Sequence, residues 1–134
     1  MEKETESSRL VIDSSVFVDH LRNYPPALEL FRSFSEGNKE RILFSAVTET
    51  ELIAGKSCND NHARSVVLNM LNSFTKIEVN NPIALKAGDL CRLYAVDLPD
   101  SIIAATALIN KAELLTRNIK DFNNIDGLKV RAPY

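Results

Sequence analysis

The chain has 134 residues, 45% of them hydrophobic, which fits one globular domain that can bury a core without disulfide bonds. No apolar run approaches the roughly 18 residues of a membrane-spanning helix, and residues 1–9 lack the apolar stretch of a signal peptide. The net charge of −2 argues weakly against nucleic-acid binding, although cations held by acidic side chains restore positive potential locally. We therefore expect a cytoplasmic protein with no membrane contact.

The predicted elements alternate between strands and helices. Residues 1–8 are mostly polar and charged and are expected to form a flexible tail before a single domain over 9–134. The β-branched run at 10–12 predicts a buried strand that ends at Asp13. Further strands are expected near 42–44, 77–79, 114–116 and 128–130, and helices near 14–21, 25–36, 45–54, 60–73, 81–95 and 101–109. This order favours an α/β fold with a mostly parallel central sheet flanked by helices.

Hydrophobic periodicity and glycine positions add detail to the helices. Helix 25–36 should stop at Gly37, and Gly55 is a candidate C-cap for helix 45–54. Helix 101–109 is apolar on nearly all sides and should be buried. Helix 60–73 should direct four residues toward the core, namely Val66, Val67, Met70 and Leu71. Helix 81–95 carries the three leucines Leu85, Leu90 and Leu93.

Acidic and amide side chains follow successive elements of the predicted sheet. Asp13 comes directly after the first strand, Glu51 lies in the helix after the second, and Asp100 lies at the start of the buried helix. Asn118 and Asp121 follow the strand that ends at Thr116. Because sites in open parallel sheets lie at the carboxyl ends of the strands, we expect these side chains to converge at one sheet edge.

Converging carboxylates repel one another and need protons or cations to remain together. Oxygen ligands select hard cations, so Mg²⁺ or Mn²⁺ is the expected occupant. A metal ion there can activate a water molecule for in-line attack on a phosphodiester and stabilise the charge that develops. The pattern therefore indicates metal-dependent cleavage of a polyanion.

Each of these residues also has a simpler structural explanation. Asp13 could cap the following helix, Glu51 could be solvated, and Asp100 could interact with a helix dipole. Asn118 and Asp121 could be turn residues. Among the other acids, Asp19 is a more distant candidate, and Glu49 should point away from Glu51. Asp97 either lines the cleft or solubilises a loop. The candidates for phosphate contact are Lys56, Arg64, Arg117 and Lys120. The combination of acids at successive element ends favours a site.

Four segments of the chain, at residues 11–17, 45–55, 100–108 and 115–122, stand in a specific order and spacing. Together they resemble the PIN-domain family, and within it the VapC toxins of toxin–antitoxin pairs. The resemblance covers the chain from residue 10 to about 130. It places the family's first three acids at Asp13, Glu51 and Asp100, and the last part of its site between Thr116 and Asp121. Many PIN domains have an acid where this chain has Asn118, so the fourth metal ligand is either Asn118 or Asp121.

The resemblance implies an endoribonuclease that uses Mg²⁺ or Mn²⁺ and acts as a toxin, with RNA as substrate. It implies catalytic roles for Asp13, Glu51, Asp100 and Asp121, metal ligation by these four and Asn118, and substrate binding by Ser15, Thr116 and Asn118. Ser15 matches a position where a small polar residue supports the metal site. The resemblance also implies a flavodoxin-like sheet, a homodimer and a small antitoxin partner.

Three other interpretations compete with this one. A phosphoacceptor receiver domain would have an acidic pair before Asp13 and a lysine near the last strand, and neither is clear. An aspartyl phosphatase would have a second aspartate two residues after the first, where this chain has Ser15. The remaining alternative is a PIN-like module that binds RNA or protein without cutting, and the intact set of acids argues against it.

Overall fold

Five parallel strands form one sheet in the order β3-β2-β1-β4-β5. The computed structural model describes residues 8–35, 41–122 and 124–134, so residues 1–7 of the expected tail and Gly37 lie outside the described residues. The strands are β1 (Leu10–Ile12), β2 (Ile42–Ser45), β3 (Thr75–Ile77), β4 (Glu113–Leu115) and β5 (Val130–Arg131). The strand order reverses at β1, and ligands of open α/β sheets bind at such a point. The expected parallel α/β fold is confirmed.

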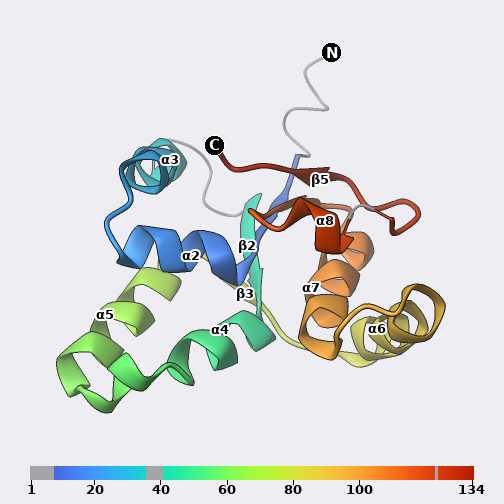
Figure 1. Ribbon diagram of the computed structural model, residues 1–134, viewed down its shortest axis with the longest axis horizontal. Coiled ribbons are helices and arrows are strands. Elements are labelled where there is room, and N and C mark those ends of the chain that lie inside the picture. Colours follow the sequence, from blue (N-terminus) through green and yellow to red (C-terminus); the bar gives the residue numbers. More distant parts are fainter. Residues whose placement is uncertain (1–7, 36–40, 123) are drawn as a thin grey trace.

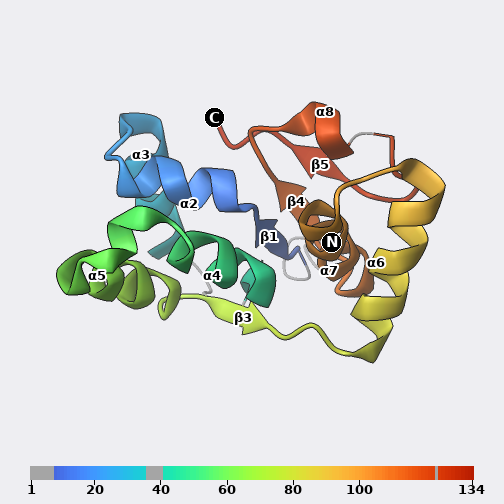
Figure 2. The same ribbon diagram turned by 60° about the horizontal axis from the view of Figure 1, so that its bottom comes forward.

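Helices cover both faces of this sheet (Figures 1 and 2). On one side lie α2 (Ser14–Leu21), α3 (Pro25–Ser35), α4 (Ala46–Ile53) and α5 (Asn61–Leu71), and on the other lie α6 (Asn81–Tyr94) and α7 (Leu98–Ile109). Two short helices, η2 (Lys56–Asn59) and α8 (Ile119–Phe122), complete the described elements. No helix in the described ranges is long and apolar enough to cross a membrane.

The sheet separates two hydrophobic clusters, and the alternation of side chains along β1 explains why. Leu10 and Ile12 belong to the cluster under α2, α3 and α5, whereas Val11 between them belongs to the cluster under α6 and α7. All three residues are buried, as expected for a strand covered on both faces. Asp13 therefore directly follows a strand that is buried on both faces.

Helix α7 is the most buried helix described, as its apolar composition predicts. Residues 103–107 are buried, and the small side chains there allow close approach to α6 and to the sheet. The two buried hydroxyl groups of α7 are satisfied nearby: Ser101 donates to the carbonyl of Val96, and Thr106 donates to the carbonyl of Ile102. A helix buried in this way holds Asp100, in its first turn, in a fixed place.

Some expectations for the helices are wrong. Val66 is 43% exposed, because Val67 and Leu71 already supply the contacts of α5 with the core. Gly55 does not cap α4 in a left-handed conformation; its φ is −66° and it begins η2. No inward face was predicted for α6, on which Ile83, Ala87 and Leu90 are buried, whereas Leu85 and Leu93 are each 65% exposed.

Candidate active site

Asp13 is buried and is held by two hydroxyl groups. It occupies the N-cap position of α2, yet its side chain makes no capping hydrogen bond. Instead, Ser15 Oγ donates to Asp13 Oδ2 at 2.9 Å, and Thr116 Oγ1 donates to the same oxygen at 2.7 Å. Among the described residues no hydrogen bond reaches Oδ1. The geometry fixes one carboxylate oxygen and leaves the other available to a cation.

The loop after β4 is bound to the same network. The backbone N–H of Asn118 donates to Thr116 Oγ1 at 2.9 Å, and that of Arg117 donates to Ser15 Oγ at 3.4 Å. Thr116 is fully buried. We expected Thr116 to bind substrate, but its buried hydroxyl fits the positioning of Asp13 instead. The side chain of Asn118 is exposed beside it.

Glu51 reaches the same edge of the sheet from α4. Ser14 Oγ donates to Glu51 Oε1 at 2.5 Å and lies 3.2 Å from Thr48 Oγ1. Thr48 is fully buried, whereas Glu51 is exposed. Residues at the start of α2 thus contact both acids, Ser15 at Asp13 and Ser14 at Glu51. Glu49 points away, as expected, and pairs with Lys76 at 3.4 Å.

Asp100 lies where the other carboxylates act on it together. Its pKa is raised from 3.8 to about 6, chiefly by burial, and the negative charges of Asp13, Asp121, Asp97 and Glu51 contribute to this rise in that order. These four carboxylates therefore lie near enough to Asp100 to act on its charge. This agrees with the convergence expected for Asp13, Glu51, Asp100 and Asp121, whose roles at the site stay a prediction.

Asp97 is a member of this cluster that the sequence left undecided. It occupies the N-cap position of α7 but makes no side-chain capping bond, and its carboxylate faces the cluster closely enough to raise the pKa of Asp100. Its spacing of three residues from Asp100, across a helix start, is the signal that could have placed it. Ser14 was also missed, because a serine at a helix start is usually read as a cap.

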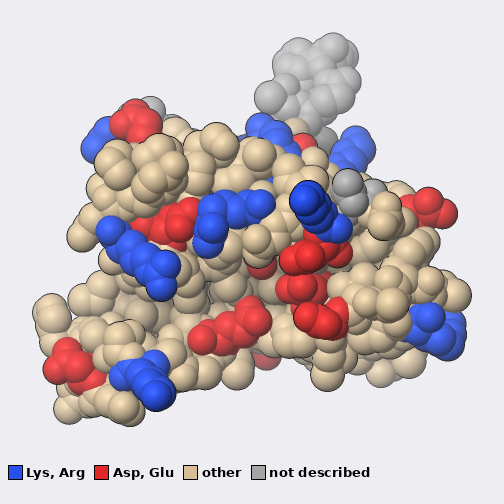
Figure 3. Space-filling view, viewed as in Figure 1, with Lys and Arg blue, Asp and Glu red and all other residues tan. Residues whose placement is uncertain are grey.

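A pocket of about 260 Å³ opens beside Asp100. Asp97, Asp100, Lys120 and Asp121 line it together with Tyr94, Ala95, Val96, Asn124 and Ile125. Acidic side chains form a continuous group on the corresponding face, over α7 and α8, with basic side chains next to it (Figure 3). Asp97, Asp100 and Asp121 are therefore accessible from solvent at this pocket.

A divalent cation fits the chemistry of these residues. Their donors are carboxylate oxygens and one amide, which suit Mg²⁺ or Mn²⁺. The pKa of Asp100 is raised first by burial and then by repulsion from the neighbouring carboxylates, and a cation would relieve that repulsion. Within the described ranges, no three acidic, histidine or cysteine side chains stand close enough to enclose an ion. Glu51 and Asp121 are exposed, so their side chains can move toward Asp13 and Asp100.

Other polar groups lie outside the carboxylate cluster. Asp19 pairs with Arg117 at 2.9 Å, His62 is exposed, and the ring of His20 packs on Phe31.

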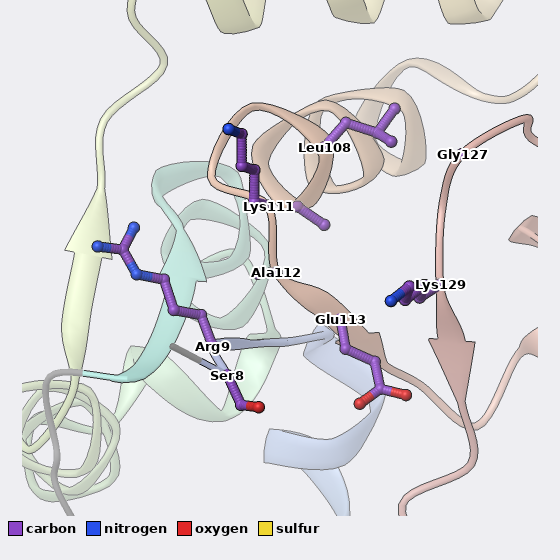
Figure 4. Close-up of a pocket in the computed structure, with 9 residues that line it drawn as sticks. Ser8, Arg9, Leu108, Lys111, Ala112, Glu113, Gly127 and Lys129 are labelled. Atoms are coloured by element: carbon purple, nitrogen blue, oxygen red, sulfur yellow. The ribbon is translucent and has the colours of Figure 1, made fainter. Parts of the chain in front are cut away.

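A separate pocket of about 510 Å³ lies where β1 and β4 begin, at the opposite end of the sheet (Figure 4). Its charged side chains are Arg9, Lys111, Glu113 and Lys129, and it contains none of the clustered carboxylates.

Comparison with known proteins places this geometry in a family. The PIN domain family model matches residues 10–128. Ribonuclease VapC19 of Mycobacterium tuberculosis is 35% identical over 121 residues, which cover 84% of this chain and 90% of the relative. Ribonuclease VapC10 of the same organism is 31% identical over 125 residues, which cover 90% of each chain.

Solved structures of toxin–antitoxin complexes have the same fold. A toxin–antitoxin complex from Klebsiella pneumoniae superimposes with a TM-score of 0.77 at 28% identity, covering 93% of this chain and 98% of the other. DNA-bound VapBC from Salmonella typhimurium gives a TM-score of 0.83 at 22% identity, covering 95% and 99%. Since the family model spans most of the sequence and its relatives match over nearly their full length, the chain belongs to the PIN-domain family.

Proposed function

We propose that this protein is an endoribonuclease that requires Mg²⁺ or Mn²⁺ and acts as the toxin of a toxin–antitoxin pair. The observation that carries the proposal is the group of five carboxylates around Asp100, at the switch point of a PIN-domain sheet. Relatives with at least 31% identity over most of the chain are named ribonucleases, which supports RNA as the substrate. The scissile phosphodiester would lie at the pocket beside Asp100.

The carboxylates have different parts in this proposal. Asp13, locked by Ser15 and Thr116, provides the fixed ligand oxygen, and Asp100 provides the second from the buried helix. Glu51 and Asp121 are exposed and complete the cation site from either side, with the Asn118 amide as a further ligand. When bound, the divalent ion lowers the pKa of water and stabilises negative charge that develops on the phosphate.

The positive charges near the cluster suit an RNA backbone. Lys120 lines the pocket with Asp100 and Asp121, and Arg117 follows Thr116 directly. A carboxylate cluster alone repels phosphates, so RNA should approach only when cations neutralise it. Substrate binding and cleavage should therefore both depend on the metal. A non-catalytic RNA- or protein-binding module is the alternative, and nothing in such a module would require five converging acids.

The proposal extends to partners and location. An antitoxin is suggested by relatives that were solved as toxin–antitoxin complexes, one of them at 28% identity. An arginine or lysine of the inhibitor placed among Asp13, Glu51 and Asp100 would pair with the carboxylates and compete with the cation. We further propose a homodimer, one nuclease domain over 9–134, and a cytoplasmic location, where RNA and antitoxin are both present.

Cleavage of RNA by the purified protein tests this proposal. We expect cleavage with Mg²⁺ or Mn²⁺, none with EDTA, and a loss of several orders of magnitude in Asp13→Asn, Glu51→Gln and Asp100→Asn. Circular dichroism should show the same folded spectrum for every variant. Glu49→Gln is the matched control, because Glu49 is two residues from Glu51 but pairs with Lys76, and it should cut at the normal rate. Full activity in the three site variants would refute the proposal.

A further inference from the structure

A second pocket, of about 770 Å³, lies on the other side of the loop that follows β4. Its described lining is Asp19, Arg22, Asn23, Tyr24, Pro25, Arg117, Ala132, Pro133 and Tyr134. We call it the tyrosine–arginine pocket. The end of α2 and the chain after β5 both contribute to its lining. It contains none of the five clustered carboxylates, and the roles given above to the acids do not explain it.

Two tyrosine rings form an exposed aromatic surface in this pocket. Tyr24 and Tyr134 are 46% and 43% exposed, and their ring centroids lie 5.3 Å apart in an edge-to-face arrangement. The Tyr134 hydroxyl donates to Asp19 Oδ2, and burial and this hydrogen bond raise the pKa of the phenol. The rings are thus held in place from one edge, while much of their surface remains open to solvent. Exposed, fixed aromatic rings are the usual platform for unstacked nucleobases.

The charges of the pocket favour a polyanion. Asp19 is already paired with Arg117 at 2.9 Å, and among the described residues no ion pair involves Arg22. The lining therefore keeps one uncompensated guanidinium beside the rings. An arginine next to an aromatic surface can bind a phosphate while the neighbouring base stacks.

A short path of contacts joins this pocket to the carboxylate cluster. Arg117 is paired with Asp19 on the pocket side, and its backbone N–H donates to Ser15 Oγ, which in turn donates to Asp13. Figure 3 shows basic and acidic side chains over α2 on the same face as the acidic group. A single strand that crosses this face can occupy both places.

We propose that the tyrosine–arginine pocket binds one unpaired nucleotide of the RNA substrate next to the scissile bond, with its base on Tyr24 and Tyr134 and its phosphate at Arg22. This inference rests on the proposed ribonuclease function, because that function makes RNA the ligand of the pocket. It adds the chemistry that selects the substrate: a single-stranded nucleotide rather than a paired one.

The test measures binding separately from cleavage. An oligoribonucleotide of about six nucleotides with one 2-aminopurine base is titrated into the full chain carrying Asp100→Asn, in Mg²⁺. Anisotropy of an end label reports binding, and quenching of 2-aminopurine reports stacking. We expect quenching at one position of the probe, and a Kd about tenfold or more weaker in Tyr24→Leu, with near-normal binding in Tyr24→Phe because the ring is kept.

The salt dependence of binding tests the phosphate contact. Arg22→Gln should reduce the slope of log Kd against log salt by about 0.7, the value for one phosphate contact in a single strand. Arg92→Gln is the matched control, since Arg92 is an exposed arginine on α6 that pairs with Asp89, and it should leave the slope unchanged. In the background with Asp100 intact, Tyr24→Leu should raise KM without changing kcat.

The outcomes separate this inference from the proposed function. Normal affinity and salt slope in Tyr24→Leu and Arg22→Gln would overturn the pocket assignment, while cleavage by the wild-type chain would leave the ribonuclease intact. Weaker binding of an inhibitor peptide by these variants, with RNA binding unaffected, would assign the pocket to a protein partner and overturn the inference. RNA binding with quenching but without cleavage would retain the pocket and reject the nuclease.

Discussion

Asp13 has the position of a helix N-cap, but its carboxylate does not cap the helix. Aspartate directly before a helix is a favoured N-cap, and the backbone of Asp13 has the extended conformation of one. Its carboxylate instead binds Ser15 from the start of α2 and Thr116 from the end of β4, 103 positions later in the chain. Burying a carboxylate is costly unless it is hydrogen-bonded, so the two hydroxyl groups offset the burial of Asp13 beside the place where a cation would bind.

Removal of the Thr116 hydroxyl should weaken the cation site. Thr116→Val keeps the shape of a buried side chain but takes one donor from Asp13, and loss of such outer-shell partners costs about 10–100-fold in metal affinity. The free energy of unfolding should fall by about 1–3 kcal/mol because Asp13 stays buried with one hydrogen-bond donor fewer. Titration calorimetry with Mn²⁺ and thermal unfolding measure the two effects.

Thr106→Val is the control for this prediction. Thr106 is as fully buried as Thr116, but its hydroxyl donates to the carbonyl of Ile102 within α7. It should lose a little stability and keep normal Mn²⁺ affinity. Equal Mn²⁺ affinity in Thr116→Val and the wild type would show that the hydroxyl does not support the site.

Asp100 should make the metal-free protein less stable as pH rises. The unfolded chain releases this proton near the ordinary pKa of 3.8, and the folded chain retains it until about 6. Between these values the folded state binds more protons, so stability is complete below the lower pKa and declines through the upper one. Because the group is partly solvated, we expect a loss of about 1 kcal/mol.

The measurement is thermal unfolding in EDTA across this range of pH, for the wild type and for Asp100→Asn. The asparagine variant cannot titrate at this position, so its melting temperature should decline less between the two pKa values. It should also exceed the wild type above the upper pKa, since one repelling charge is absent. Parallel pH profiles for the two proteins would contradict the assigned electrostatic coupling.

At the scale of elements, most helices and strands could be predicted from the sequence because each has a local pattern of apolar and polar residues. The run at 10–12 and the apolar composition of α7 each identified an element that the structure contains. Helix α8 was missed because four residues show no periodicity. Val66 was misplaced because adjacent valines on α5 cannot both face the core, and local pattern does not decide between them.

Helix α6 ends at a residue that is poorly suited to its conformation. Ala95 is its C-cap with φ 57° and ψ 39°, in the left-handed region that glycine adopts without steric penalty. Ala95→Gly should therefore stabilise the protein by about 0.5–1 kcal/mol, after allowance for the greater freedom of glycine in the unfolded chain. Chemical denaturation with unchanged m-value measures this gain.

The same substitution inside the helix should have the opposite sign. Ala84 is an exposed alanine of α6 whose N–H bonds the carbonyl of Asn80 in regular helical geometry. Ala84→Gly should cost about 0.5–1 kcal/mol. If both variants lose stability, the left-handed conformation at Ala95 is not a source of strain in solution.

At the scale of the molecule, the sequence predicted that acids would converge but could not give the strand order. Sites in open parallel sheets lie at the carboxyl ends of the strands, and this rule predicted that Asp13, Glu51 and Asp100 lie together without specifying which strands are neighbours. Pairing of β1 with β4 depends on contacts between residues about 100 positions apart, which no local pattern specifies. The role of Thr116 as a partner of Asp13 follows from that pairing, so only the structure could reveal it.

The surface of α6 leads to a prediction about assembly. Leu85 and Leu93 are eight residues apart on the outer side of this helix, and both are largely exposed. Single exposed leucines are ordinary, but two on one helix face suit the centre of a symmetric interface. We expect a homodimer at tens of micromolar protein in sizing chromatography with light scattering, and a monomer when Leu85→Glu and Leu93→Glu are combined.

Val66→Glu is the control for assembly, because Val66 is also an exposed apolar residue but lies on α5, on the other side of the sheet. It should leave the dimer intact. The combined leucine variant should keep a folded spectrum, since neither side chain contributes to the buried core. A wild-type mass equal to one chain would reject the dimer, and a dimer that persists in the combined variant would move the interface away from α6.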